Sequence, residues 1–385
     1  MNRRVITLLA VIVFTCAYVS SVCLADNRER IKAIGIPLAD HYAGIVAFEK
    51  YRDKMQYADY QLMILPGPGL VRAYFRSEPD ADIAFNVTPM VIDMFAAKPD
   101  FRWVSLIHRD GNALAINELM NEKVDLDMSR KARLPDNKIA EAISAFKRET
   151  GESLEIAIPH PLATHTTILY KYLKEQGKSF SFNRHENTDV MFKIVKPPES
   201  PVYLKKKAAR SQAAAFEQSL PWAEVVETDG NGYVGWYSKD VMQHEHGHVE
   251  CIVIAKDEVI ENKTKALREV IYYIHQAGRD IESARRNGGE EMEEIVRMVR
   301  KHVPAHTREA IIQSLRIDLN VINYSNLNVD ANAKASFKEI MDLAFEAGFI
   351  KQKIDINKLA DSQFSTDIDP IHSKPLPQAH TRAFK

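Results

Sequence analysis

The sequence is short of cysteine, and the cysteines it has cannot form an internal disulfide. Of the three cysteines in 385 residues, Cys16 and Cys23 lie in an apolar N-terminal stretch, and Cys251 alone lies beyond it. A single thiol has no internal partner, even in an oxidising compartment. The fold must therefore be stabilised by its apolar core.

Long apolar runs are also scarce, and the clearest one is N-terminal. Arg3 and Arg4 precede apolar residues 5–18, and small residues then lead to Ala25. This order is typical of a secretory signal peptide, whereas a membrane span needs about 20 apolar residues. No small residue directly precedes Cys16 or Cys23, as a lipoprotein would require. We predict a signal peptide over residues 1–25 and export to the periplasm, by either the Sec or the twin-arginine route.

The chain has no excess of positive charge and no familiar catalytic motif. Without Arg3 and Arg4, the 51 basic residues become 49 against 52 acidic ones, a net charge of −3. A nucleic-acid-binding protein would show a clustered basic excess, so we predict no nucleic-acid partner. No Gly-x-Ser-x-Gly, phosphate loop or HExxH is present, so we predict a protein that is not an enzyme.

What the sequence does have is an alternation of strand and helix patterns. Strands separated by helices are typical of the α/β class with mainly parallel sheets, and a mature chain of about 360 residues predicts two domains. Strands are expected at 31–37, 60–69, 81–87, 102–109, 154–161, 190–195, 232–238 and 249–256. Helices are expected at 43–55, 89–97, 137–149, 164–177, 205–220, 263–278, 289–302, 307–315 and 335–347.

The late strands predict a discontinuous first lobe. We expect lobe 1 to comprise residues 26–125 and 245–350, lobe 2 to comprise 150–240, and 361–385 to form a flexible tail. Ligands in open α/β sheets bind beyond the carboxyl ends of strands, at points where the strand order reverses. The loops that follow the strands are therefore the candidate ligand contacts.

Polar residues follow several of these strands, and each has a structural alternative. Asp40 is also a plausible helix cap, Arg109 can pair with Asp110, and Thr164 can cap the next helix. The Arg109 guanidinium could bind a carboxylate, sulfonate or bicarbonate through two parallel hydrogen bonds. Trp236 and Tyr237 are expected near the point where the chain crosses between lobes, and they either line the cleft or pack in the hinge. The candidates are Asp40, His41, Asn86, Thr88, Arg109, His160, Thr164, His165, Trp236, Tyr237, His248 and Glu250.

The run VMQHEHGHVEC at 241–251 is typical of a metal site. If it is extended, His244, His246, His248 and Glu250 point to one face, because side chains in a strand repeat every two positions. Gly247 favours a turn, which would break that arrangement. In the extended form Cys251 would point to the opposite face, as a buried core residue. Solvated histidines in a loop are the alternative to zinc or another divalent metal.

Three stretches resemble a known family. IKAIGIPLADHYAGIVAFEKY, DIAFNVTPMVIDMF and IAIPHPLATHTTILYKYLKEQG are similar to the extracytoplasmic solute-binding proteins of ABC importers for nitrate, bicarbonate, sulfonates and taurine, and to thiamine-pyrimidine precursor proteins. The resemblance spans about residues 30–350. It implies a type II periplasmic-binding-protein fold, two lobes that close on a small solute, and an inner-membrane permease as partner. The histidine run at 244–250 is not a signature of that family.

These features together predict a monomeric periplasmic receptor for a small anionic solute, with no required cofactor. One alternative is a metal-dependent or zinc-binding receptor that uses His244 to Glu250. Another is a pyrimidine-precursor binding or synthesis protein.

Overall fold

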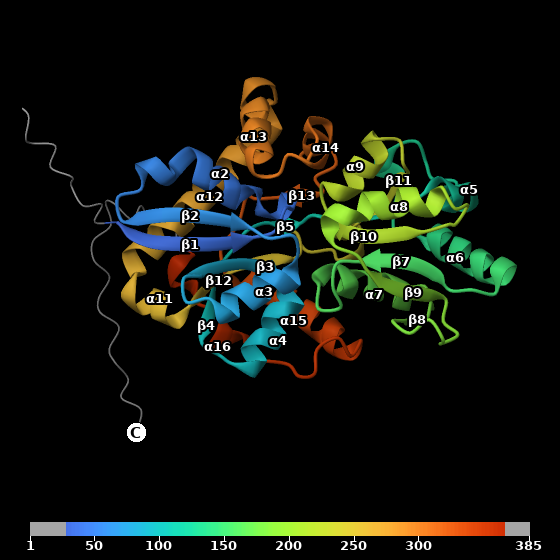
Figure 1. Cartoon of the computed structure of the whole chain (residues 1–385), viewed down its shortest axis with the longest axis horizontal. Helices are drawn as coiled ribbons and strands as arrows, with labels where there is room; N and C mark the ends of the chain where they lie inside the picture. The colour runs from blue at the N-terminus through green and yellow to red at the C-terminus, as the bar shows by residue number, and fades with distance from the viewer. Residues whose placement is uncertain (1–27, 366–385) are drawn as a thin grey trace, which may run out of the picture.

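The computed structural model describes residues 28–365, and these form two lobes that lie side by side (Figure 1). The first lobe contains a five-stranded sheet in the order β2-β1-β3-β12-β4. β1 pairs in parallel with β2 and β3, whereas β12 is antiparallel to β3 and β4. Its strands are β1 (Glu29–Gly35), β2 (Ala58–Ile64), β3 (Ile83–Val87), β4 (Phe101–Leu106) and β12 (Cys251–Lys256).

The second lobe contains a six-stranded sheet in the order β11-β6-β10-β7-β9-β8. β7 is parallel to β10 and β9, and β6 is antiparallel to β10 and β11. Its strands are β6 (Asn112–Ile116), β7 (Leu154–Ile158), β8 (Phe180–Ser181), β9 (Val190–Ile194), β10 (Ala215–Ser219) and β11 (Tyr233–Tyr237).

Helices cover both sheets and bury their apolar faces against them. In the first lobe, α2 and the long α12 pack together over β1 and β2, and Trp103 of β4 stacks on Phe337 of α15. The helices of this lobe are α2 (Tyr42–Tyr51), α3 (Pro68–Ser77), α4 (Thr88–Ala97), α11 (Asp257–Asn262), α12 (Thr264–Asn287), α13 (Gly289–His302), α14 (Arg308–Ser314), α15 (Ala331–Glu346) and α16 (Ile356–Leu359). Those of the second lobe are α5 (Glu118–Val124), α6 (Asn137–Thr150), α7 (Thr164–Glu175), α8 (Ser200–Ala208), α9 (Trp222–Thr228) and α10 (Ser238–Val241).

The chain crosses between the lobes next to a short two-stranded sheet of β5 (Arg109–Asp110) and β13 (Ile322–Asn323). Backbone hydrogen bonds connect the lobes here: Ala39 N–H donates to Leu220 O at 2.6 Å, and Leu220 N–H donates to Gly111 O at 2.8 Å. Gly111 has a φ of +101°, which a side chain would disfavour. The crossover therefore places the loop after β1 beside the end of β10.

Most of the predicted elements are present, and four expectations need correction. Residues 215–219 form β10, a central strand, rather than the end of a helix over 205–220. The chain enters the second sheet at Asn112 with β6, so lobe 1 ends before residue 125. The sheets are mixed rather than mainly parallel. Pro68 begins α3, so the strand expected over 60–69 ends early.

Two of the predictions, the signal peptide and the flexible tail, concern the ends of the chain. The predicted signal peptide, residues 1–25, lies outside the described residues, as do 366–385 of the predicted tail. Within the described part, Ser362–Phe364 form a short 3-10 helix in which Phe364 is buried. No helix between residues 28 and 365 has the length and apolar character needed to cross a bilayer.

Candidate ligand site between the two lobes

Four metal-ligating side chains meet at the edge of the first sheet that faces the second lobe. Asp40 lies in the short 3-10 helix Ala39–His41 after β1, and His108 follows β4. Glu250 and Cys251 lie at the start of β12. Because β12 is antiparallel to β3 and β4, its first residues lie beside the last residues of those strands. All four side chains are fully buried.

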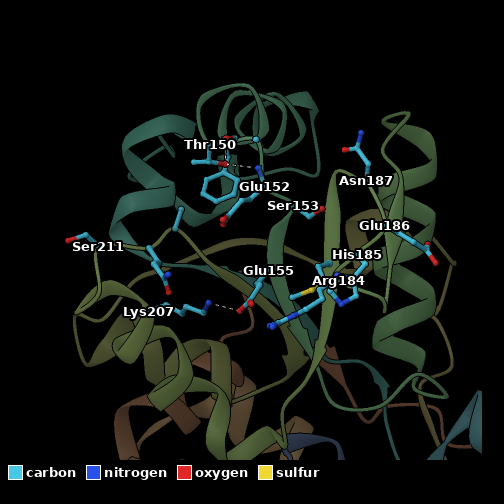
Figure 2. Close-up of a pocket in the computed structure, with 15 residues that line it drawn as sticks. Thr150, Glu152, Ser153, Glu155, Arg184, His185, Glu186, Asn187, Lys207 and Ser211 are labelled. Atoms are coloured by element: carbon cyan, nitrogen blue, oxygen red, sulfur yellow. Dashed lines mark hydrogen bonds and ion pairs between the residues drawn. The ribbon is translucent and has the colours of Figure 1, made fainter.

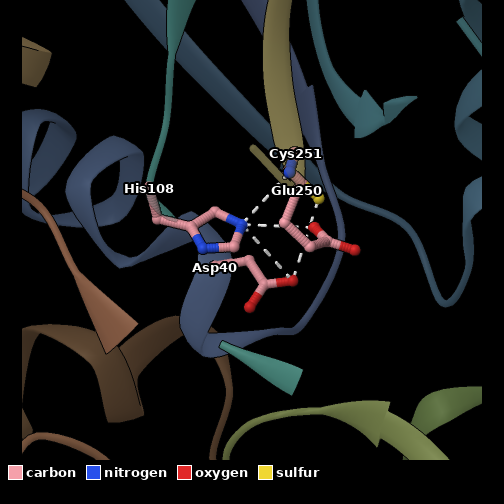
Figure 3. A group of neighbouring side chains, drawn as sticks. All are labelled: Asp40, His108, Glu250 and Cys251. Atoms are coloured by element: carbon pink, nitrogen blue, oxygen red, sulfur yellow. Dashed lines mark hydrogen bonds and ion pairs between the residues drawn. The ribbon is translucent and has the colours of Figure 1, made fainter. Parts of the chain in front are cut away.

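The donor atoms of these four residues converge (Figure 3). His108 Nε2 lies 3.2 Å from Glu250 Oε2 and 3.6 Å from Asp40 Oδ2. The Cys251 thiol lies 3.8 Å from the same Asp40 oxygen. One donor atom from each residue lies within 4.8 Å of all the others. Asp40, His108, Glu250 and Cys251 are called the inter-lobe cluster below.

The second lobe contributes two side chains that contact the inter-lobe cluster. Ser219, at the end of β10, donates its hydroxyl proton to Asp40 Oδ2 at 2.6 Å. His165, in the first turn of α7, has Nε2 2.5 Å from the Ser219 oxygen and Nδ1 3.2 Å from Glu250 Oε1. His165 thus lies between the Ser219 hydroxyl and the Glu250 carboxyl group, with one ring nitrogen beside each of them.

Several buried polar atoms around this point have no hydrogen-bond partner among the described residues. A buried polar atom without a partner costs about 1–3 kcal/mol, so a group of them indicates a place where another molecule or ion binds. These atoms are Asp40 Oδ1, His108 Nδ1, Asn112 Nδ2, His165 Nδ1, both oxygens of Glu217, and Glu250 Oε1.

Burial opposes ionisation throughout the inter-lobe cluster. It raises the pKa of Glu250 to about 7 and raises the pKa of Asp40 well above its ordinary range. It also lowers the pKa of His108 and raises that of the Cys251 thiol. For His165, burial lowers the pKa to about 3. The shared cause is that a charged group is poorly solvated in the interior. A bound positive charge would favour the ionised acids.

The residues predicted from the sequence divide between this place and others. Asp40, His165 and Glu250 lie in or beside the inter-lobe cluster. Thr88 and Thr164 contact it through the main chain, because both hydroxyls donate to Glu250 O, at 2.8 Å and 3.2 Å. Thr164 is the first residue of α7, and Ala163 takes the cap position that was predicted for Thr164.

Other predicted residues have local partners. His41 Nδ1 accepts from Ile36 N–H at 2.8 Å, Asn86 Oδ1 accepts from Val87 N–H, and His160 Nδ1 accepts from Leu162 N–H. Trp236 packs against Tyr172, and the Tyr237 hydroxyl donates to Glu224 at 2.8 Å. These contacts hold turns and the second-lobe core.

Arg109, the predicted clamp for an anion, points away from the inter-lobe cluster. Its guanidinium donates to Asn326 O at 2.8 Å and to Gly247 O at 3.3 Å, and it lies 3.8 Å from Asp330. Within residues 28–365, Asp40 and Glu250 lie beside His108 and His165, whose pKa values burial lowers, and no Arg or Lys pairs with either acid. The inter-lobe cluster is thus acidic.

The structure brings only Glu250 of the four predicted metal ligands into a metal-ligating group. Gly247 N–H donates to His244 O in a turn, so 244–250 is not extended. His246 is exposed, and His244 lies 3.0 Å from Glu339. His248 is buried, with Nε2 2.9 Å from Ser238 Oγ. The turn that Gly247 favours therefore separates the histidines from Glu250.

Sequence reasoning missed His108, Ser219 and the role of Cys251. The position of His108 at a strand end, directly before Arg109, could have identified it as a candidate ligand contact. Cys251 is buried as expected, but it lies in the inter-lobe cluster rather than in an apolar core. Ser219 was not identified because its strand was predicted to be a helix.

The second lobe also has a surface hollow of about 670 Å³, which lies elsewhere (Figure 2). Glu155, near the start of β7, pairs there with Lys207 at 2.5 Å, and Arg184 and His185 line the same hollow. It opens at the amino end of β7, whereas ligands in this class of sheet bind at the carboxyl ends.

The two lobes, the crossover between their sheets and the buried polar residues at the strand ends define the periplasmic-binding-protein fold. The chain belongs to the NMT1-like family, whose model matches residues 35–296. No curated protein has a sequence that matches it.

Solved structures agree on the fold. The periplasmic nitrate-binding protein NrtA from Synechocystis PCC 6803 is 18% identical with a TM-score of 0.69, covering 88% of this chain and 87% of that one. A zinc-bound ligand-binding component of an ABC-type import system from Staphylococcus aureus is 14% identical with a TM-score of 0.66, covering 89% and 100%. The aliphatic sulphonate binding protein SsuA from Escherichia coli is 13% identical with a TM-score of 0.60, covering 91% and 96%. The predicted family and fold class are confirmed.

Proposed function

We propose that this protein is the periplasmic substrate-binding component of an ABC importer. It captures a small solute between its lobes and delivers it, as a monomer, to a permease in the inner membrane. The family and the fold support this role, as does the basic-apolar-small order of residues 1–25. The observation that carries the proposal is the set of unpaired, fully buried polar atoms contributed by both lobes at one point.

Closure of the two lobes around a solute would explain why unpaired polar atoms are buried between them. Ser219 and His165 of the second lobe reach the inter-lobe cluster only when the lobes are together, so a solute bound there stabilises the closed form. An open form would let the same polar atoms bind water. The protein thus acts by binding and closing, with no chemical step.

The predicted anionic solutes (nitrate, sulfonate or bicarbonate) need a positively charged partner. Arg109 is the predicted one, and it would have to leave Asn326 and Gly247 to reach a solute. A planar pyrimidine would need an aromatic wall, but Trp236 and Tyr237 pack within the second lobe. The second candidate, a metal-dependent receptor, is favoured by the four donor atoms of the inter-lobe cluster.

The test is a thermal-shift screen combined with small-angle X-ray scattering on protein stripped of co-purified ligand. A true solute at 100 times its Kd adds about 2.7 kcal/mol to the unfolding free energy and raises the Tm. It should also reduce the radius of gyration, because the lobes close. The panel contains nitrate, bicarbonate, taurine, alkanesulfonates, hydroxymethylpyrimidine and divalent metals. If no member both raises the Tm and compacts the protein, the proposed function is wrong.

A further inference from the structure

We propose that the inter-lobe cluster binds a divalent first-row transition-metal ion, with Zn²⁺ as the best fit, through Asp40, His108, Glu250 and Cys251. This inference rests on the proposed function for its biological meaning, because the ion would be the solute around which the lobes close. As a binding site it stands on geometry alone.

The separations match the edges of a tetrahedral coordination shell. Zinc bonds of about 2.0–2.1 Å to nitrogen or oxygen and 2.3 Å to sulfur place two such ligand atoms about 3.3–3.6 Å apart. The observed separations are 3.2 Å between His108 Nε2 and Glu250 Oε2 and 3.6 Å between His108 Nε2 and Asp40 Oδ2. The Cys251 Sγ to Asp40 Oδ2 separation is 3.8 Å. The other three separations are at most 4.8 Å, so shifts of about 1 Å would bring all four atoms onto one ion.

The histidine is held in the tautomer that a metal needs. Cys251 N–H donates to His108 Nε2 at a long 3.3 Å, which places the lone pair on this nitrogen, and a metal ion would replace that weak contact with the amide. The same nitrogen is the one nearest to Asp40 and Glu250 (Figure 3).

The donor types select among metals. Two carboxylates, one imidazole and one thiol form a mixed oxygen, nitrogen and sulfur set, which suits zinc and its transition-metal neighbours. Ca²⁺ takes six to eight oxygen ligands and Mg²⁺ requires an octahedron of oxygens, so neither fits. The site should therefore discriminate against the two most abundant divalent cations.

Unpaired buried groups provide the independent sign of a cation. Glu250 Oε1 and Asp40 Oδ1 have no hydrogen-bond partner, and neither has either oxygen of Glu217, whose pKa is raised by burial and by Glu250. His165 Nδ1 lies 3.2 Å from Glu250 Oε1, and both atoms are buried without a hydrogen-bond partner. A cation bound beside the unpaired carboxyl oxygens would offset the cost of burying them.

The second lobe would sense the ion through its ligands. Ser219 orients the Asp40 carboxylate, and His165 orients Ser219 and faces Glu250. Such supporting hydrogen bonds commonly change metal affinity 10- to 100-fold. Metal binding to the first lobe would thereby draw the second lobe closed.

The first measurement is the metal content of the mature full-length chain, purified from the periplasm without an affinity tag. Mass spectrometry of the metals should find about one transition-metal ion per chain. After chelator treatment, Zn²⁺ and Co²⁺ should rebind, whereas Ca²⁺ and Mg²⁺ should not. Bound Co²⁺ should show intense visible bands of a four-coordinate site and a thiolate charge-transfer band.

Two site variants and one surface control assign the ligands. H108Q should weaken Co²⁺ binding more than 100-fold, and C251S should abolish the charge-transfer band while it retains weaker binding. The double variant H244A/H246A, in the exposed histidine run, should leave both unchanged. Circular dichroism verifies that each variant folds; if H108Q does not, the charge-transfer band of C251S alone decides.

The outcomes separate this inference from the proposed function. If Zn²⁺ does not bind but an anion or pyrimidine compacts the protein, the metal site is refuted and the receptor role stands. If Zn²⁺ binds at these residues without compaction, the metal site stands and the receptor role for the ion falls. If binding is lost only in H244A/H246A, the surface run is the metal site and the inter-lobe assignment is overturned.

Discussion

Buried histidines have different roles in this protein, although burial lowers the pKa of His108, His165 and His306 alike. His108 and His165 leave a ring nitrogen without a hydrogen-bond partner at the lobe interface. His306 instead has both ring nitrogens paired: Nδ1 lies 2.9 Å from the Tyr42 hydroxyl, and Nε2 lies 3.1 Å from Pro37 O. Nε2 must donate to the carbonyl, so Nδ1 accepts from Tyr42. Both nitrogens of His306 have partners within the protein, so this histidine has a structural role.

His306 should make the protein sensitive to acid. Burial lowers its pKa to about 3, from about 6.5 in the unfolded chain. The unfolded state then binds the proton more readily, so His306 contributes its full stability above pH 6.5 and loses it as the pH falls toward 3. The loss is about 1.4 kcal/mol per pH unit, or about 2 kcal/mol between pH 6.5 and pH 5.

Urea unfolding at pH 7 and pH 5 measures this effect in the wild type and in H306Q. Glutamine can replace both hydrogen bonds and does not titrate, so H306Q should lose about 2 kcal/mol less than the wild type over this range. Other buried histidines contribute equally to both proteins and cancel in the difference. Identical pH dependence in the two proteins would show that His306 does not carry the effect.

At the scale of elements, close packing of α2 on β3 fixes the loop that carries Asp40. A Cβ on Gly44 of α2 would lie 2.5 Å from Cε2 and 2.9 Å from Cζ of Phe85 in β3. The Phe85 ring is fully buried and packs edge-on against His41, so it has little room to move. Gly44 thus sets the distance between the helix and the sheet.

G44A should destabilise the protein by about 1–3 kcal/mol, the usual cost of overpacking. Alanine normally favours a helix over glycine by about 0.5–1 kcal/mol, so a net loss would show that the contact with Phe85 dominates. Gly69 of α3 is the control, because a Cβ there would come no nearer than 3.8 Å to another residue, at the His160 ring. Equilibrium unfolding should show G69A no less stable than the wild type; a stabilised G44A would refute the packing argument.

Local pattern predicted most elements but not the cluster. The expected helix over 289–302 has the observed bounds of α13, because its apolar residues repeat at helical spacing. Residues 215–219 failed because alanine-rich sequence favours helix locally, whereas pairing with β6 and β7 makes them a strand. That pairing brings Ser219 to Asp40, 179 positions away in the chain. Such a contact depends on topology, which the sequence pattern does not encode.

At the scale of the whole molecule, the same few residues both bind and hold the lobes together. The crossover bonds at Ala39, Gly111 and Leu220 connect backbone to backbone. Ser219 is the side chain that bridges the lobes at the inter-lobe cluster, because its hydroxyl lies between Asp40 of the first lobe and His165 of the second. Removal of this hydroxyl should therefore act on the equilibrium between open and closed forms.

S219A should shift the protein toward the open form. Alanine leaves Asp40 Oδ2 and His165 Nε2 without their shared partner in the closed form, whereas water can bind both in the open form. The radius of gyration of ligand-free protein should increase, and affinity for the solute should fall about 10- to 100-fold. S314A is the matched control, since the Ser314 hydroxyl is also buried but donates within its own helix, to Ala310 O at 2.8 Å. S314A should lower stability without changing the scattering. If S219A scatters and binds like the wild type, lobe closure does not depend on the contact between Asp40 and Ser219, and other contacts, such as that of Thr164 with Glu250 O, hold the lobes.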